Sequence, residues 1–304
     1  MKQSPILSVQ NLNVAFKSNT GLNEVLHGIS YNLFPNEILG IVGESGSGKS
    51  VASLAVMGLL PPKKSVISYG EIVFKSEDIL QYTQKELEVL RGQKIAMIFQ
   101  EPMSALNPSM CCGIQVEEIL LQHTSISKKA AKDEVIRLFT AVKIPAPKDT
   151  FEKYPHEISG GQQQRVMIAM AIACKPDVLI ADEPTTALDV TVQKDIITLL
   201  RTLQKESKMS VIFISHDLAL VSEIANRILV MYKGTIVERG DTKSVFKTPK
   251  EDYTKALIGA RPTLKSRLKL LPTISDFLSD SISKTVISNN ARTQKHKEIY
   301  SQAP

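Results

Sequence analysis

The sequence lacks any long hydrophobic run. None of the stretches in its 304 residues approaches the roughly 18 consecutive apolar residues that a membrane-spanning helix requires. The opening segment, MKQSPILSVQ, also lacks the apolar core of a signal peptide. Both absences argue against a membrane-spanning or secreted protein, and we expect the chain to stay in the cytoplasm.

Cysteine is scarce. The three cysteines, Cys111, Cys112 and Cys174, have no CxxC spacing and no histidine cluster beside them. This is not the pattern of a zinc site or of a disulfide framework, so we expect reduced thiols with a structural role. No cysteine follows Cys174, which excludes a cysteine-held metal cluster in the C-terminal region.

Clustered charge is missing from the body of the chain. The formal net charge is +6, and residues 241–304 account for all of it with 12 Lys and Arg against 6 Asp and Glu. The neutral remainder offers no footprint for nucleic acid, so we expect no nucleic-acid partner. We interpret the basic tail, residues 263–304, as a solvated linker; contact with anionic lipid and docking to a partner are the alternatives.

The chain does contain short apolar runs that end abruptly in polar or glycine residues. The runs at residues 37–42, 178–181 and 211–214 are typical of buried strands, and helical stretches such as residues 192–205 separate them. This alternation predicts a parallel sheet covered by helices. In such sheets ligands gather at the carboxyl ends of the strands, so one site can include the residues that follow all three runs.

The strongest motif follows the first run. Residues 43–50 read GESGSGKS, which fits GxxxxGK[ST] between a predicted strand and a predicted helix. Glycines let the backbone curl so that its N–H groups point at phosphate oxygens, and the start of the helix adds a favourable dipole. We expect the lysine to neutralise the β- and γ-phosphates and the last serine to bind Mg²⁺. The predicted ATP-binding residues of this loop are Gly43, Glu44, Ser45, Gly46, Ser47, Gly48, Lys49 and Ser50.

Two carboxylates follow the run at residues 178–181. Asp182 suits a magnesium-bound water, and Glu183 suits a general base for the attacking water, because paired carboxylates at one site can take different roles. The alternative is a helix N-cap followed by a surface acid.

A second glycine motif, ISGGQ at residues 158–162, stands at the start of a predicted helix over residues 162–173. Such a start is another anion-binding site, yet a phosphate held by the first loop has no need of it. Two sites facing one nucleotide suggest two protomers. The residues predicted to act on the partner's ATP are Ser159, Gly160, Gly161 and Gln162.

The motifs GESGSGKS, ISGGQ, LIADEP, TALD and His216, in that order, resemble an ABC ATPase nucleotide-binding domain over about residues 6–260. The resemblance implies an α/β P-loop NTPase fold with a mainly parallel sheet and an antiparallel N-terminal β portion. The proline-punctuated helical patterns after residue 100 predict a helical subdomain inserted at about residues 101–160. We expect the nucleotide-binding domain to cover residues 1–262.

Further roles come from the resemblance alone. Gln100 resembles the Q-loop glutamine that contacts magnesium and water, and His216 the switch histidine that contacts the γ-phosphate. Asp189 resembles the D-loop aspartate that crosses the dimer interface. Phe16 lies where the family places an aromatic ring under adenine; the alternative is an ordinary core residue. The predicted catalytic residues are thus Glu183, His216 and Lys49, and the predicted metal ligands are Ser50, Gln100 and Asp182.

Three stretches, EPMSALNP, VMIAMAIACKP and ADEPTTALDVTVQ, are similar to the dipeptide, oligopeptide and nickel importer branch. This implies ATP and Mg²⁺ as ligands and a second ABC ATPase domain, in a homodimer, a heterodimer or a fused chain. It also implies permease partners at the inner face of the cell membrane, an indirect solute-binding protein, and import of peptides or a related small solute.

Other interpretations remain at this stage. A soluble ABC ATPase acting on ribosomes or nucleic acid is one alternative, and a non-hydrolysing subunit is another, although Glu183 and His216 argue against the second. The ending SQAP echoes the opening QSPILSVQNL, so we hypothesise that the sequence is the first half of a tandem two-ATPase protein.

Overall fold

The computed structural model of the chain describes residues 3–19, 21–101, 105–186 and 188–260. It divides into two compact units, Met1–Thr242 and Lys243–Pro304. The second unit contains most of α10 (Thr242–Lys247) and α11 (Asp252–Gly259). The expected tail, residues 263–304, lies outside the described residues, and the domain boundary at about residue 262 stays a prediction.

The N-terminal part of the first unit is an antiparallel sheet, as expected from the family resemblance. Its strands lie in the order β2-β1-β4-β5. Strand β1 pairs along its length with both β2 and β4. The strand bounds are β1 Leu7–Ser18, β2 Gly21–Leu33, β4 Ser65–Phe74 and β5 Glu77–Asp78.

The second sheet is the mainly parallel core that the apolar runs predict. Its order is β10-β9-β3-β8-β7-β6, and only the edge strand β10 is antiparallel to its neighbour. Every residue of β3, β7 and β8 is buried, which explains why these strands appear in the sequence as continuous apolar runs. The bounds are β3 Ile38–Val42, β6 Ile95–Ile98, β7 Val178–Asp182, β8 Ser210–Ile214, β9 Arg227–Tyr232 and β10 Thr235–Asp241.

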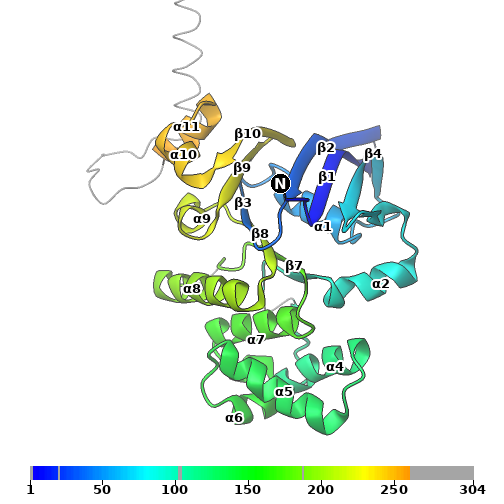
Figure 1. Cartoon of the computed structure of the whole chain (residues 1–304), viewed down its shortest axis with the longest axis vertical. Helices are drawn as coiled ribbons and strands as arrows, with labels where there is room; N and C mark the ends of the chain where they lie inside the picture. The colour runs from blue at the N-terminus through cyan, green and yellow to red at the C-terminus, as the bar shows by residue number, and fades with distance from the viewer. Residues whose placement is uncertain (1–2, 20, 102–104, 187, 261–304) are drawn as a thin grey trace, which may run out of the picture. The chain divides into compact units, whose positions relative to one another are not determined.

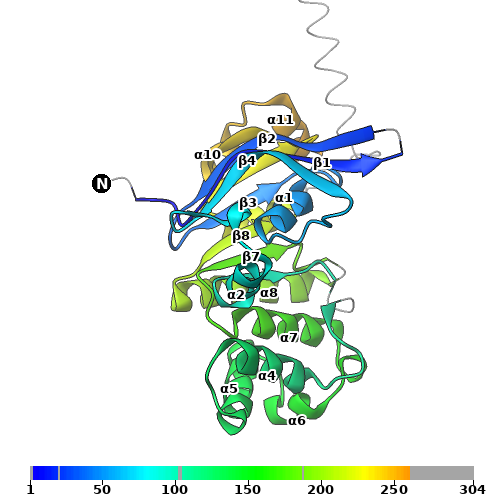
Figure 2. The ribbon, with the colours of Figure 1, turned by 90° about the vertical axis from the view of Figure 1, so that its right-hand side faces the viewer.

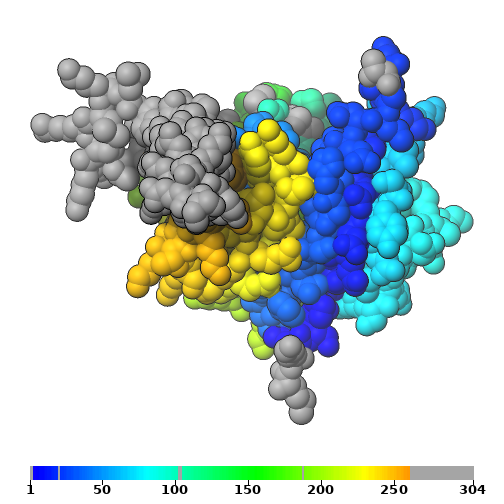
Figure 3. Space-filling view, turned by 90° about the horizontal axis from the view of Figure 1, so that it is seen from above, coloured from blue at the N-terminus to red at the C-terminus, as the bar shows by residue number. Residues whose placement is uncertain are grey.

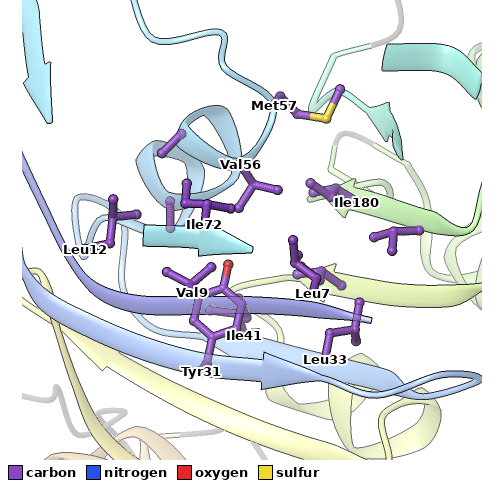
Figure 4. Close-up of a cluster of buried hydrophobic side chains, with 14 of the residues drawn as sticks. Leu7, Val9, Leu12, Tyr31, Leu33, Ile41, Val56, Met57, Ile72 and Ile180 are labelled. Carbon is purple, nitrogen blue, oxygen red and sulfur yellow. The ribbon is translucent and has the colours of Figure 1, made fainter. Parts of the chain in front are cut away.

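Helix α1 (Lys49–Val56) is packed between the two sheets. Its buried side chains, including Val56, join one hydrophobic cluster with Leu7 and Leu33 of the antiparallel sheet and with Ile41 and Ile180 of the parallel sheet (Figure 4). The sheets also meet at β2 and β10, which lie side by side in the space-filling view (Figure 3). The helix that follows the glycine loop is therefore fixed from both sides.

Of the remaining helices of the first unit, six form two groups, and α2 packs against β6 and α4. Helices α4, α5, α6 and α7 pack on one another as the expected helical subdomain (Figures 1 and 2), but α7 extends to Ile172, beyond the expected end at about residue 160. Helices α8 and α9 pack together, and α9 lies on β3. The bounds are α2 Gln84–Gln93, α4 Cys112–His123, α5 Lys128–Ala141, α6 Pro147–Glu152, α7 Gly160–Ile172, α8 Val190–Ser207 and α9 Leu218–Ile224, with 3₁₀ turns at Ile79–Gln81 and Pro155–Glu157.

The central strand β8 provides a test of this architecture. The side chain of Phe213 is 0% exposed in the middle of that strand. We expect Phe213→Ala to lower the free energy of unfolding by about 3–5 kcal/mol, because it leaves a cavity between packed layers. Chemical unfolding followed by circular dichroism measures the change. Leu22→Ala, at a side chain that is 62% exposed, is the matched control and should shift stability by no more than about 0.5 kcal/mol. Equal effects of the two substitutions would contradict the assignment of β8 to the core.

Candidate nucleotide site

The predicted site residues stand at the carboxyl ends of adjacent parallel strands. Strands β3, β8, β7 and β6 are neighbours in that order, and Figure 1 labels the first three. Their ends lead directly into the glycine loop, His216, Glu183 and Gln100. The register brings Asp182 opposite Ile214 and Ile98 opposite Ala181, so these ends lie level with one another. One edge of one sheet thus presents the polar groups expected to act on the nucleotide that this chain itself binds.

The glycine loop is folded around the side chain of Lys49. Its Nζ donates to the carbonyl oxygens of Gly43 and Glu44, both at 2.9 Å, and the residue is 5% exposed. Burial lowers the pKa of Lys49, while the carboxylates of Glu183 and Asp182 act in the opposite direction. The ammonium group therefore lies at the centre of the loop, where it can meet a phosphate.

Two glycines of this loop are required by close contacts. A Cβ at Gly43 would lie 2.2 Å from the carbonyl oxygen of Met231, and one at Gly48, whose φ is +99°, would lie 2.7 Å from Leu26 Cδ2. Only glycine accepts such backbone approach together with a left-handed conformation. The loop is thus held against β9 on one side and β2 on the other.

The turn between β9 and β10 supports the loop, and sequence reasoning missed it. Gly234, at φ +77°, donates its N–H to the carbonyl oxygen of Ser47 at 3.1 Å and accepts from the N–H of His27 at 2.9 Å. A Cβ there would lie 2.1 Å from the carbonyl oxygen of Val25. The sequence pattern that could have predicted this tight hairpin is Lys233-Gly234, which lies between two apolar segments.

The Asp182 side chain is 5% exposed at the end of β7 and is hydrogen-bonded to Ser50, the first residue after Lys49. Its second oxygen, Oδ1, is buried without a hydrogen-bond partner. Burial raises the pKa of Asp182, although the bond from Ser50 and the charge of Lys49 act against it. An orphaned carboxylate oxygen beside a hydroxyl is the oxygen-rich environment that Mg²⁺ prefers, so the residues present fit that cation.

Glu183 is the centre of a hydrogen-bond network. Its Oε2 accepts from Gln100 Nε2 at 3.2 Å and from Thr186 Oγ1 at 2.9 Å, and His216 Nδ1 lies 3.1 Å away. A carboxylate only accepts hydrogen bonds, so the facing His216 nitrogen is the donor. Glu183 has a φ of +46°, a conformation that non-glycine residues seldom adopt. Three of the predicted site residues therefore converge, together with Thr186, which the sequence did not single out.

The ISGGQ segment caps the start of α7. Ser159 Oγ accepts from the N–H of Gln162 at 3.3 Å, and Gln162 Oε1 accepts from the N–H of Ser159 at 3.1 Å. The helix begins two residues earlier than predicted because the cap is Ser159 itself. Ser159 and Gly160 are exposed, so the first amides of α7 face outward on the helical subdomain. This arrangement suits contact with a group from another chain.

Asp189 and Phe16 make local contacts of their own. Asp189 Oδ1 accepts from the N–H of Val192 at 2.9 Å and caps α8. Phe16 lies in β1 between Asn23 and Ser65 and packs, partly buried, against the hydrophobic cluster. Stacking of its exposed part on adenine stays a prediction.

The thiols and the acidic residues give no sign of a metal cluster. Cys111, Cys112 and Cys174 are free, and burial raises the pKa of Cys112 to about 11. In the described part of the chain no group of three or more His, Cys, Asp and Glu residues could hold a metal ion. Within the same residues, no helix is long and apolar enough to cross a membrane.

A groove of about 610 Å³ lies beside the site, between the parallel sheet and the helical subdomain. Its wall includes Phe99, which directly precedes Gln100 and is 40% exposed. Four methionines also line it: Met57, Met97, Met167 and Met170. The groove is largely apolar, with Glu88, Arg91 and His123 as its charged or titratable members.

Residues 26–186 match the family model described as ABC transporter. The chain belongs to this family. It is 48% identical over 259 residues to the dipeptide transport ATP-binding protein DppD of Bacillus subtilis, covering 85% of this chain and 77% of the relative. It is 50% identical to DppD of Haemophilus influenzae, covering 88% and 81% of the two chains. The oligopeptide transport ATP-binding protein OppD of Bacillus subtilis is 47% identical, with 86% and 73% covered.

Solved structures agree with this membership. A dimeric structure of the ATP-binding cassette MJ0796 bound to ADP and phosphate has a TM-score of 0.70 at 26% identity, covering 78% of this chain and 98% of that one. The cbiO1 protein of Clostridium perfringens, part of an ABC transporter complex, has a TM-score of 0.69 at 30% identity, covering 84% and 95%. The expected family and fold are confirmed, and as an ABC cassette the chain is an ATP-binding ATPase. Membership supports the transporter interpretation rather than the soluble alternative.

Asp182 allows a test of the cation site that does not depend on turnover. Because burial raises its pKa, the folded state holds that proton more tightly than the unfolded state, and stability falls as the pH rises above the ordinary carboxyl range. We therefore expect Asp182→Asn to raise the Tm of the nucleotide-free chain at neutral pH. Adding Mg²⁺ should raise the Tm of the parent chain but not that of the variant. A variant that melts lower than the parent, or that gains equally from Mg²⁺, would contradict this assignment.

Proposed function

We propose that two ABC domains of this kind close on two ATP molecules and that the resulting movement drives import of peptides through a membrane permease. The observation that carries the proposal is the convergence of Gln100 and His216 on the carboxylate of Glu183, next to the glycine loop. Loop, acid, amide and imidazole come from four adjacent strand ends, which is the set of groups that phosphoryl transfer needs.

The proposed chemistry assigns one task to each group. The amides of residues 43–48 and the ammonium of Lys49 bind the β- and γ-phosphates, and Glu183 accepts the proton of the attacking water. His216 donates to the terminal phosphate. Ser50, Asp182 and Gln100 would hold Mg²⁺, which would offset the negative charge of the phosphates.

The catalytic site is proposed to be complete only in a dimer. The first amides of α7, with Ser159 and Gly160, are exposed and can bind a phosphate held by another chain. Asp189 would then lie at the interface. The dimeric form of the MJ0796 cassette supports this arrangement. The second domain can be a copy of this chain, a different subunit or a fused half.

Peptide transport is proposed for this chain because the relatives at 47–50% identity are named as dipeptide and oligopeptide transport ATP-binding proteins. We place the subunit at the inner face of the cell membrane, bound to a permease and acting indirectly with a solute-binding protein. Residues 1–262 form the ATPase domain in this proposal, and residues 263–304 a basic linker.

The groove beside the site is the proposed binding site for the permease. A short apolar helix of the permease fits its chemistry, because apolar residues, Phe99 and the four methionines among them, supply most of the lining. Phe99 is covalently continuous with Gln100, which bonds Glu183, so an occupant of the groove can sense the state of the catalytic carboxylate. This continuity is what favours a permease segment over other occupants.

Glu183→Gln tests the catalytic part of the proposal. The amide can no longer accept the water proton, so we expect ATP hydrolysis to fall about 10²- to 10⁴-fold while ATP binding stays within about twofold. The ATP-bound variant should accumulate as a dimer, which light scattering measures. Glu118→Gln, at an exposed glutamate of α4, is the matched control and should hydrolyse normally. Normal turnover by Glu183→Gln would remove Glu183 from the proposed role.

Phe99→Glu tests the groove and the cargo together. A carboxylate in the apolar groove should weaken permease binding, so we expect uptake of labelled peptide by cells carrying the variant gene to fall at least about tenfold. The ATPase rate of the isolated subunit should not change. Leu121→Glu, at an α4 residue that is 39% exposed and outside the groove lining, serves as control.

Deletion of the gene separates the test of the cargo from the test of the groove. Peptide uptake should fall in the deletion strain, whereas uptake of free amino acids should continue. Wild-type peptide uptake after deletion would contradict the cargo. Reduced uptake after deletion but normal uptake with Phe99→Glu would instead contradict the groove.

A further inference from the structure

The turn that follows β7 holds Glu183 through its own backbone. The N–H of Glu183 donates to the carbonyl oxygen of Ile214 at 3.0 Å, and its carbonyl oxygen accepts from the N–H of Thr186 at 3.1 Å. With φ at +46°, the residue needs these bonds to keep a conformation that side chains disfavour. Thr186 is thus a backbone anchor of the residue whose carboxylate is at the centre of the site.

Thr186 also contacts the carboxylate itself. Its Oγ1 donates to Glu183 Oε2 at 2.9 Å, which is the shortest of the three contacts to that oxygen. A hydrogen bond to a charged group is stronger than one between neutral groups, and it also fixes direction. The same residue therefore anchors Glu183 at both the main chain and the side chain.

The other two donors differ from Thr186 in where they come from and in how freely they move. Gln100 follows β6 and His216 follows β8, and the side chain of His216 is 61% exposed, whereas Thr186 is half-buried in the same turn as Glu183. The proposed function requires both Gln100 and His216 to turn toward the nucleotide and its cation. Thr186 has no such second role, so it is the donor that keeps its hydrogen bond to Glu183.

We propose that Thr186 is a positioning residue for the ATPase reaction: its hydroxyl holds the Glu183 carboxylate in place once Gln100 and His216 have moved to the nucleotide. This inference rests on the proposed role of Glu183 as general base. The Thr186 hydroxyl bonds Oε2 of Glu183, not Oε1. Oε1 therefore stays available to accept the water proton. Thr186 itself exchanges no proton with substrate.

The decisive variant is Thr186→Val, which keeps the branched shape and removes the hydroxyl. In the full chain we expect kcat for ATP to fall about tenfold, equivalent to about 1.4 kcal/mol in the barrier, with the KM for ATP within about twofold of the parent. Thr186→Ser restores the donor and should recover at least half of the lost rate. Thr198→Val, which removes a hydroxyl bonded only to the Lys194 carbonyl on the exposed side of α8, is the matched control and should behave like the parent.

A double-mutant cycle with Glu183→Gln distinguishes positioning from general support of the fold. If Thr186 acts through the carboxylate, Thr186→Val should cause no further loss in a chain that already carries Glu183→Gln. A further tenfold loss there, or a fall in Tm or ATP affinity of Thr186→Val that Thr186→Ser repairs only in part, would overturn the inference. So would a normal kcat for Thr186→Val. Normal turnover by Glu183→Gln alone would instead refute the proposed function, which keeps the two failures apart.

Discussion

The register of three parallel strands is the constraint on which the whole site depends. Ile41 of β3 and Asp182 of β7 both lie opposite Ile214 of β8, so the three strands end at one level. Backbone bonds extend this alignment one step further, from Ser215 to Ile41 and from Glu183 to Ile214. A shift of one residue in any of these pairings would turn a buried strand face over and separate the glycine loop from the carboxylates. Close packing of the side chains on both faces of these strands opposes such a shift.

The parts of the site that the sequence predicts are those set by local chain chemistry. Residues 43–50 need glycine wherever the backbone curls or is approached closely, and the buried strands need apolar side chains on both faces, so both leave clear patterns. The order of the motifs along the chain then indicates which strands end at the same edge of the sheet. The resemblance to a known family supplied the roles of Gln100 and His216, which no local pattern reveals.

The rest depends on contacts between distant segments or on backbone angles. Strand β2 is exposed along much of its first half, so no apolar run marks it. The support that Gly234 gives to Ser47 joins residues far apart in sequence. Thr186 contacts Glu183 in a turn where Glu183 has a positive φ, and residue types alone do not indicate that conformation. Such features become visible only when the chain is folded.

Hydrogen bonding of buried side-chain atoms is less complete in the site than in the surrounding core. Five buried side-chain atoms have no hydrogen-bond partner among the described residues, and two of them, Ser47 Oγ and Asp182 Oδ1, lie in the glycine loop and at the end of β7. Buried polar groups are otherwise nearly always paired, and an unpaired one costs about 1–3 kcal/mol. Ligand binding can return this free energy, which couples occupancy of the site to its rigidity.

The methionine lining of the groove has a consequence for the range of apolar segments that the groove can bind. Thioether side chains are unbranched and polarisable, so they repack around side chains of different shape with little loss of contact. Met57, Met97, Met167 and Met170 come from the turn after α1, from β6 and from α7, and together they make one compliant surface. A segment that packs there can exchange one apolar residue for another without a matching substitution in this chain. The groove can therefore accept apolar segments of more than one sequence, whereas the catalytic groups a few residues away each need one fixed position.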